Sequence, residues 1–167
     1  MFYPKLEGYA LEAHKAAVDK LRMDAAKELK LGQDQLITRD LRPEDLGLTG
    51  RWSYNVTSTS GWYTMISAAT IAQNRFISIE GVIYPKSSAQ LITQLEINRS
   101  GSVVRYWTIQ GINLLENPMV VFDNPLTLGQ NQPITIRGYN PTTTTEPAEE
   151  VMFIGTVVEK RGVLVND

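Results

Sequence analysis

The chain has 167 residues, a formal net charge of −2, no cysteine and one histidine. There is no basic excess to neutralise a phosphate backbone, which argues against general nucleic-acid binding, and no thiolate for disulfides, covalent catalysis or zinc. No run of about 20 apolar residues is present, so we expect no transmembrane helix and no membrane partner. The charges are unevenly distributed: residues 1–51 contain 18 of the 34 charged side chains, whereas residues 52–148 contain ten.

Residues 1–32 are predicted to form an amphipathic helix, running from about Leu6 to Leu31 and ended by Gly32. Alanine, leucine, lysine and glutamate dominate this stretch. The apolar stripe is narrow and partly alanine, so the helix needs a surface to pack on. That surface is either the β body of the same chain or a neighbouring subunit or other protein. For the second alternative, the partner-binding side chains of the stripe are Leu11, Val18, Leu21, Ala25 and Leu29.

Residues 33–51 are predicted to be an extended arm or linker. Leu36-Ile37-Thr38 could add one strand to a sheet, and the acidic residues after Pro43 suit a short helical turn. The arm is either a surface crossover whose charges pair locally or a segment that reaches a neighbouring subunit. In the second case, Leu41 and Leu46 would contact the partner.

Residues 52–167 are predicted to form a jelly-roll-like antiparallel β-sandwich of about eight strands. Alternating or β-branched runs are separated by turn residues throughout this body, and residues 142–150 are expected to be an exposed loop. The strand order stays open, because several Greek-key orders share the same local pattern. The fold class is therefore mainly β, preceded by one N-terminal helix and an extended arm. The expected strands are Trp52–Val56, Tyr63–Ser67, Arg75–Tyr84, Gln90–Ile97, Val103–Gln110, Met119–Phe122, Ile134–Tyr139, Val151–Glu159 and Val163–Val165.

The clearest hairpin joins the run 90–97 to the run 103–110. In each run one face suits the core and the other is only moderately apolar. This pattern makes Tyr106, Trp107 and Tyr84 candidates for an exposed or interfacial patch, with core packing as the alternative for Trp107.

Trp62 and Tyr63 follow the polar turn Ser58-Thr59-Ser60-Gly61. An aromatic pair beside hydroxyl-bearing residues could stack on a sugar ring, so these two residues are candidates for glycan binding. The alternative is an aromatic pair that anchors the loop.

The titratable residues do not form a recognisable catalytic set. His14 is predicted to be half-buried on the helix and bonded to a neighbour, because a metal site or pH switch would need partners that the sequence does not show. A glycosidase needs two facing carboxylates, and no G-x-S-x-G nucleophile motif is present. We expect a non-enzymatic protein with no cofactor and no metal. The candidate carboxylates in the body are Glu80, Glu96, Glu116 and Asp123.

A helical or extended N-terminal arm before a small jelly-roll body poor in charge resembles the capsid decoration (cement) proteins and other minor virion proteins of bacterial viruses. The residues behind this resemblance are the Leu11–Leu29 stripe, the arm 36–50 and the strands from Arg75 to Glu159. It is an architectural resemblance without a diagnostic motif. It implies a structural protein on the capsid surface, synthesised in the host cytoplasm, with capsid or other virion proteins as partners. Self-association is expected, as a trimer before a dimer.

Two further functions compete with this interpretation. Jelly-roll bodies also occur in receptor-binding fibre tips and lectin-like modules, so a carbohydrate- or receptor-binding sandwich is the alternative. An enzyme is the least favoured class.

Overall fold

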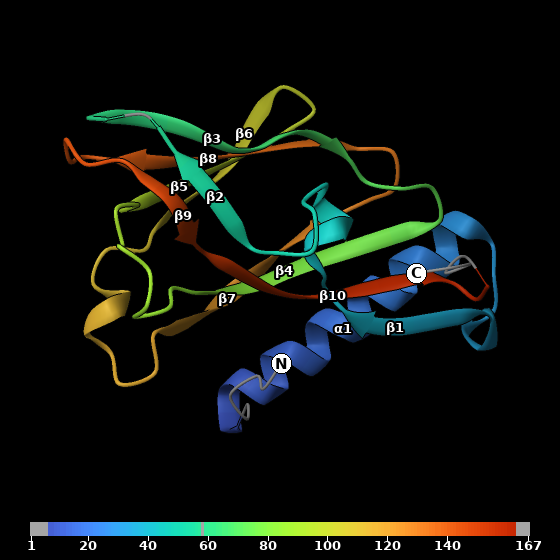
Figure 1. Ribbon diagram of the computed structural model, residues 1–167. Helices are drawn as coiled ribbons and strands as arrows, with labels where there is room; N and C mark the ends of the chain where they lie inside the picture. Colours follow the sequence, from blue (N-terminus) through green and yellow to red (C-terminus); the bar gives the residue numbers. More distant parts are fainter. Residues whose placement is uncertain (1–6, 58, 163–167) are drawn as a thin grey trace.

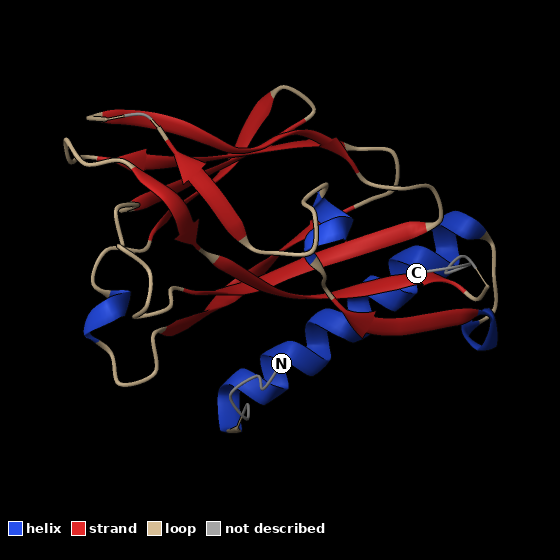
Figure 2. Ribbon diagram, in the orientation of Figure 1, coloured by secondary structure: helices blue, strands red, loops and turns tan. Residues whose placement is uncertain are grey.

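The protein is a two-layered β-sandwich with one helix on the outer side of one layer (Figures 1 and 2). The computed structural model describes residues 7–57 and 59–162. The helical elements are α1 (Gly8–Leu29), η1 (Gln33–Gln35), η2 (Pro43–Leu46) and η3 (Ile112–Leu114). The strands are β1 (Leu36–Asp40), β2 (Ser53–Val56), β3 (Gly61–Thr70), β4 (Arg75–Ile83), β5 (Gln94–Arg99), β6 (Ser102–Thr108), β7 (Met119–Leu128), β8 (Pro133–Asn140), β9 (Glu146–Glu150) and β10 (Met152–Lys160).

The strand pairing is that of a jelly roll. β1 pairs with β10, β2 with β9, β3 with β8, β4 with β7 and β5 with β6, so each pair nests inside the previous one. Two more pairings, β10 with β4 and β5 with β8, roll this long hairpin into the sheets β1-β10-β4-β7 and β3-β8-β5-β6, while β2 and β9 form a separate two-stranded sheet. All pairs are antiparallel. The predicted mainly β, jelly-roll-like sandwich with an N-terminal helix is therefore confirmed.

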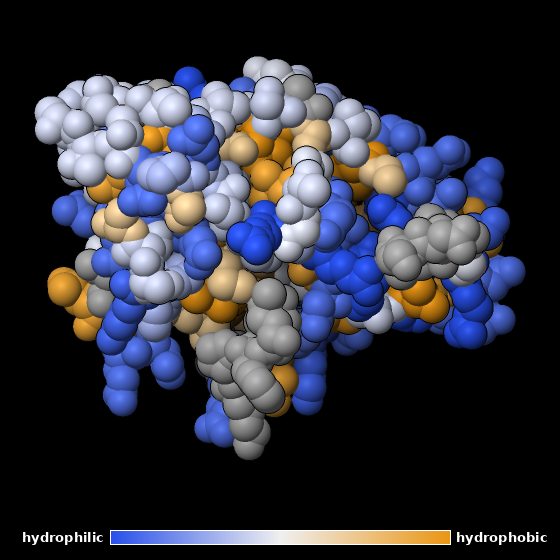
Figure 3. Space-filling model, in the orientation of Figure 1, coloured by the Kyte–Doolittle hydropathy of each residue, from blue (hydrophilic) through white to orange (hydrophobic). Residues whose placement is uncertain are grey.

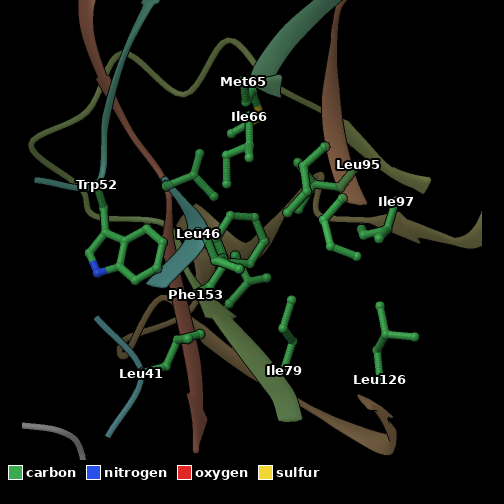
Figure 4. Packing of buried hydrophobic residues seen from close by; sticks show 14 of the residues in the cluster. Leu41, Leu46, Trp52, Met65, Ile66, Ile79, Leu95, Ile97, Leu126 and Phe153 are labelled. Carbon is green, nitrogen blue, oxygen red and sulfur yellow. The ribbon is translucent and has the colours of Figure 1, made fainter. Parts of the chain in front are cut away.

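The main core lies between the two sheets and includes residues of the predicted arm (Figure 4). Leu41 and Leu46 are 2% and 0% exposed and pack among the core residues, in the same cluster as Trp52, Ile79 and Phe153. The prediction that Leu41 and Leu46 contact a partner is therefore wrong, because their side chains are enclosed by their own chain. η2, which contains Leu46, also contacts β3 of the opposite sheet.

Helix α1 packs on the outer face of the sheet β1-β10-β4-β7. Leu21 and Ala25 are buried in a second apolar cluster with Leu36, Phe76 and Val158. The stripe therefore packs on the β body of its own chain. The assignment of Leu21 and Ala25 to partner binding is wrong, because both side chains are already buried there. The remaining stripe residues, Leu11, Val18 and Leu29, are only partly buried.

The covering helix explains the composition of β4. Residues 76–82 of this strand are all buried, because the core lies on one side and α1 on the other. A strand that is covered on both faces reads as a near-continuous apolar run, and here the run is interrupted only by Ser78, Glu80 and Gly81.

The first part of the arm adds an edge strand, as Leu36-Ile37-Thr38 suggested. An ionic cluster with buried carboxylates and partly buried arginines joins it to the body. Both terminal nitrogens of Arg39 donate to the Asp45 carboxylate at 2.7 Å, and its Nε donates to Glu159 at 3.0 Å. Arg75 Nε donates to the same Glu159 carboxylate at 2.7 Å. Burial alone would lower the pKa of the Arg39 guanidinium, but its bonds to both carboxylates raise that pKa above its ordinary value. We call these four residues the ionic cluster.

The remaining expectations differ in detail from the structure. The segment 142–150, expected to be a loop throughout, contains β9, and β7 continues six residues beyond the predicted end of its strand. The helix ends at Leu29, and Lys30, not Gly32, takes the left-handed conformation with φ of 56°. The expected strand Val163–Val165 lies outside the described residues.

Candidate functional site

The outer face of the sheet β3-β8-β5-β6 carries a connected row of aromatic and charged side chains. Alternation along β8 turns its isoleucines to the core and the residues between them outward. The register sets Trp62 beside Tyr139, and Glu96 beside both Arg137 and Tyr106. All four strands thus contribute to this aromatic row, which consists of Trp62, Tyr139, Arg137, Glu96 and Tyr106.

The aromatic row is held by direct contacts. The rings of Trp62 and Tyr139 have centroids 5.3 Å apart with an interplanar angle of 58°. The guanidinium carbon of Arg137 lies 5.2 Å from the Trp62 ring centroid, within cation–π range. Arg137 also donates from Nε and Nη2 to Glu96 Oε1, at 2.9 and 2.7 Å. These contacts fix the orientation of Trp62 before any ligand arrives.

The aromatic row contains one positive charge, on Arg137, and one carboxylate, on Glu96, and the carboxylate is buried. The Glu96 side chain is 5% exposed, whereas that of Arg137 is 39% exposed. A hydrogen bond to Glu96 raises the pKa of the Tyr106 hydroxyl. The groups offered to solvent are therefore aromatic surface and part of a guanidinium, a combination that suits a ligand with both apolar and hydroxyl-bearing faces.

The structure separates the two predicted glycan-binding residues. Trp62 lies on the outer face, but Tyr63 points the other way and packs against the core. Burial raises the pKa of the Tyr63 hydroxyl. The assignment of Tyr63 to a glycan site is thus wrong, because neighbours in a strand face opposite sides of a sheet. Tyr139, which the sequence interpretation missed, is the aromatic neighbour of Trp62.

The predicted aromatic patch is also divided. Tyr106 is 63% exposed, as the patch requires. Tyr84 is buried, and its hydroxyl accepts a hydrogen bond from the backbone of Ile92 at 2.9 Å. Trp107 faces inward and stacks on Phe122 with ring centroids 3.9 Å apart, which is the core-packing alternative. Of the three, only Tyr106 presents its side chain largely to solvent.

A second exposed feature is the turn at η3, which the sequence interpretation did not single out. Leu114 and Leu115 are 84% and 45% exposed, whereas Ile112 in the same turn is buried. Figure 3 shows apolar side chains projecting at the left edge of the molecule, where Figure 1 draws η3. The two leucines, here called the leucine turn, project into solvent from a loop that the buried side chain of Ile112 fixes to the body. The adjacent leucines in the segment 111–118 were the available signal.

The candidate carboxylates of the body do not form a facing pair. Glu80 lies under α1, where it accepts hydrogen bonds from His14 at 2.5 Å and from Thr156 at 2.8 Å. Glu96 belongs to the outer face of the opposite sheet. Glu116 and Asp123 are exposed. The prediction for His14, a half-buried helical residue bonded to a neighbour, is confirmed.

The position of Glu80 depends on two close backbone approaches. Glu80 is the extra residue of a bulge where β4 pairs with β10, and it is also unpaired where β4 meets β7. A Cβ atom on Gly81 would lie 2.4 Å from the Val120 carbonyl oxygen, and one on Gly155 would lie 2.1 Å from that of Ser78. Only glycine fits at these two positions, which lets the bulge aim Glu80 at the helix.

Metal sites and membrane-spanning helices were also considered for the described residues. Within residues 7–57 and 59–162, no group of three or more His, Cys, Asp or Glu side chains is placed to hold a metal ion. None of the helices in this part of the chain is both long enough and apolar enough to span a membrane.

The chain was compared with family models, curated proteins and solved structures. No family model matches the chain, and no curated protein matches it in sequence. Among solved structures, it is similar to the C-terminal carbohydrate-binding module (CBM6) of LamC, a marine laminarinase from Zobellia galactanivorans, with a TM-score of 0.34 and 8% identity over 74% of this chain and 100% of that chain. At that TM-score the likeness carries no weight for function.

Proposed function

We propose that the protein is a non-enzymatic structural component of a virion, a capsid cement or other minor capsid protein, that binds neighbouring capsid subunits through its charge-poor β body. The virion assignment rests on architectural analogy, since jelly-roll bodies are common in capsids but serve other functions as well. The observation that supports docking is the leucine turn, where two adjacent apolar side chains project into solvent.

The contact surface proposed here differs from the one that the sequence suggested. Leu21, Ala25, Leu41 and Leu46 already stabilise the protein's own fold, so the helix and arm cannot offer them to a capsid. The leucine turn can be buried without rearranging the body. Full burial of a leucine side chain contributes about 1.5–3 kcal/mol.

The first experiment tests whether the protein is part of virus particles and whether the leucine turn binds it to them. Replacing Leu114 and Leu115 together by Ser is expected to weaken co-sedimentation with purified virus particles at least about tenfold, the equivalent of about 1.4 kcal/mol. Met23, 67% exposed on α1, supplies the matched control as Met23→Ser, which should co-sediment like wild type.

Two results would contradict this proposal. If mass spectrometry of gradient-purified particles from the source culture does not find the protein, the virion assignment fails. If the protein is present but the double variant co-sediments normally, the leucine turn is not the contact.

A second candidate function is glycan binding on the aromatic row. The specific observation in its favour is the arrangement of Trp62, Tyr139 and Arg137, which places two rings and a cation on one open sheet face. A sugar could stack its C–H face on the rings while its hydroxyls accept hydrogen bonds from the guanidinium.

For glycan binding we expect the wild-type protein to bind at least one sugar on a glycan array and Trp62→Ala to lose that binding about tenfold or more. Tyr63→Phe is the control, because Tyr63 lies on the opposite face of the same strand and the change keeps its ring. Circular dichroism should show both variants folded. An array on which the wild-type protein binds nothing would remove this candidate.

A further inference from the structure

The four outer edges of the two large sheets are not equally protected against pairing with another strand. Edge strands are usually guarded by prolines, bulges or charged side chains. β7 has Pro125 and a bulge, and Arg99 donates to its Thr127 carbonyl at 3.1 Å. β1 has a charged end at Arg39 and Asp40, and β3 is broken by two register shifts. β6 has no proline, one charged side chain and one irregularity close to the hairpin tip, so most of its length is regular.

β6 has the features of an open edge. It contains no proline, and its single charged side chain is Arg105. Its pairing with β5 has one irregularity, near the hairpin tip between Ile97 and Asn98. Every residue of β6 is at least partly exposed, with Val103 43% and Tyr106 63% exposed. Among the described strands, β5 alone pairs with it. Valine and aromatic side chains are those that paired strands favour.

We propose that β6 pairs in antiparallel fashion with β6 of a second copy of this chain across a two-fold axis, centred on Tyr106. The sheets β3-β8-β5-β6 of the two copies would then join into one eight-stranded sheet. The olive hairpin at the top of Figure 1 ends in the turn between β5 and β6, beside this edge.

The charge of Arg105 favours the register centred on Tyr106 over the register centred on Arg105. A two-fold centred on Arg105 would set two guanidinium groups directly opposite each other, which is destabilising. A two-fold centred on Tyr106 sets the two exposed tyrosines side by side and places Arg105 of each copy opposite Trp107 of the other, on one face of the sheet. β6 is self-complementary in this register, because each Arg105 meets a Trp107 and no like charges are opposed, which favours a second copy of this chain as the occupant.

This arrangement predicts a dimer in place of the trimer that the sequence resemblance favoured. Antiparallel pairing of a strand with itself has two-fold symmetry and cannot close a three-membered ring. The contact is one strand wide and therefore small, so we expect a dimer that forms with increasing protein concentration. The proposal is independent of the capsid and glycan proposals.

A cysteine cross-link tests both the contact and the register, because the chain has no cysteine of its own. Directly opposed residues in an antiparallel pair have Cα atoms about 4.5–5.5 Å apart, within disulfide range. Tyr106→Cys is therefore expected to give a covalent dimer under mild oxidation. Thr108→Cys is the matched control: it is exposed on the same face, but the two copies of residue 108 would lie about 14 Å apart at 3.4 Å per residue.

A charge introduced at the centre gives a second measurement that does not depend on disulfide chemistry. Tyr106→Lys sets two ammonium groups opposite each other and should raise the dimer dissociation constant, measured by analytical ultracentrifugation, at least about tenfold, with an unchanged circular dichroism spectrum. The proposal is overturned if the wild-type protein stays monomeric at all concentrations, if Tyr106→Cys and Thr108→Cys cross-link alike, or if the lysine variant dimerises as wild type does. A monomer that pairs β6 with a different protein's strand also overturns it.

Discussion

Replacing Leu21 by Asp is expected to lower the free energy of unfolding by about 4 kcal/mol. Leu21 is 1% exposed and lies where α1 meets the sheet, against Phe76 and Val158. The substitution removes apolar burial and encloses a carboxylate among apolar side chains. Urea denaturation monitored by circular dichroism measures the effect. The urea concentration at the midpoint of unfolding should fall, while the dependence of the free energy of unfolding on urea concentration stays the same.

Met23→Asp is the matched control for this experiment. Met23 lies on the same helix but is 67% exposed, so its replacement should change the free energy of unfolding by no more than about 0.5 kcal/mol. If Leu21→Asp proved as stable as wild type, the helix would not be held on the sheet in solution, and the interpretation of the stripe as a partner-binding surface would return.

Replacing Glu159 by Gln is expected to cost about 3 kcal/mol of stability, because it breaks the ionic cluster from its centre. Glu159 is 0% exposed and accepts hydrogen bonds from both Arg39 and Arg75. Without its charge, two partly buried guanidinium groups share the single carboxylate of Asp45. The cluster also ties β1 and η2 to β4 and β10, so the arm should loosen first, which amide hydrogen exchange in residues 36–46 can detect.

Glu150→Gln is the control for the charge change itself. Glu150 is an exposed acid on β9, and neutralising it should leave the midpoint of unfolding nearly unchanged. If the Glu159 variant were as stable as this control, the ionic cluster would contribute nothing to the free energy of unfolding. The effect should depend little on salt, because buried pairs are poorly screened.

The candidate sites were only partly predictable from the sequence. The turn signal before Trp62 identified one member of the aromatic row, but the sequence pattern gave no reason to prefer Tyr139 over Tyr63 as its neighbour. Trp62 and Tyr139 are 77 residues apart and meet only through the pairing of β3 with β8. The leucine turn could have been noticed from its adjacent leucines, yet exposure cannot be read from a short apolar run.

The same limit applied to the leucines of the head and arm. Leu21 and Leu41 were recognised as apolar residues that need a covering surface, which was correct. Whether that surface belonged to the same chain or to a partner depended on where the sheet lay in space. The helix stripe matches a complementary strip on β4 and β10, formed by Phe76 and Val158.

The sequence by itself determined the class of this protein: one amphipathic helix, followed by short alternating strands that are typical of an all-β sandwich or barrel, and the hairpin of β5 and β6. These features are local, because periodicity and turn residues act within a few positions of one another. The nested pairing of β1 with β10 through β5 with β6, the burial of the helix stripe and the arm, and the opposite faces of Trp62 and Tyr63 were decided by tertiary structure. Such contacts join residues up to 124 positions apart, as between Leu36 and Lys160, and they depend on strand register and sheet closure, which local pattern does not specify.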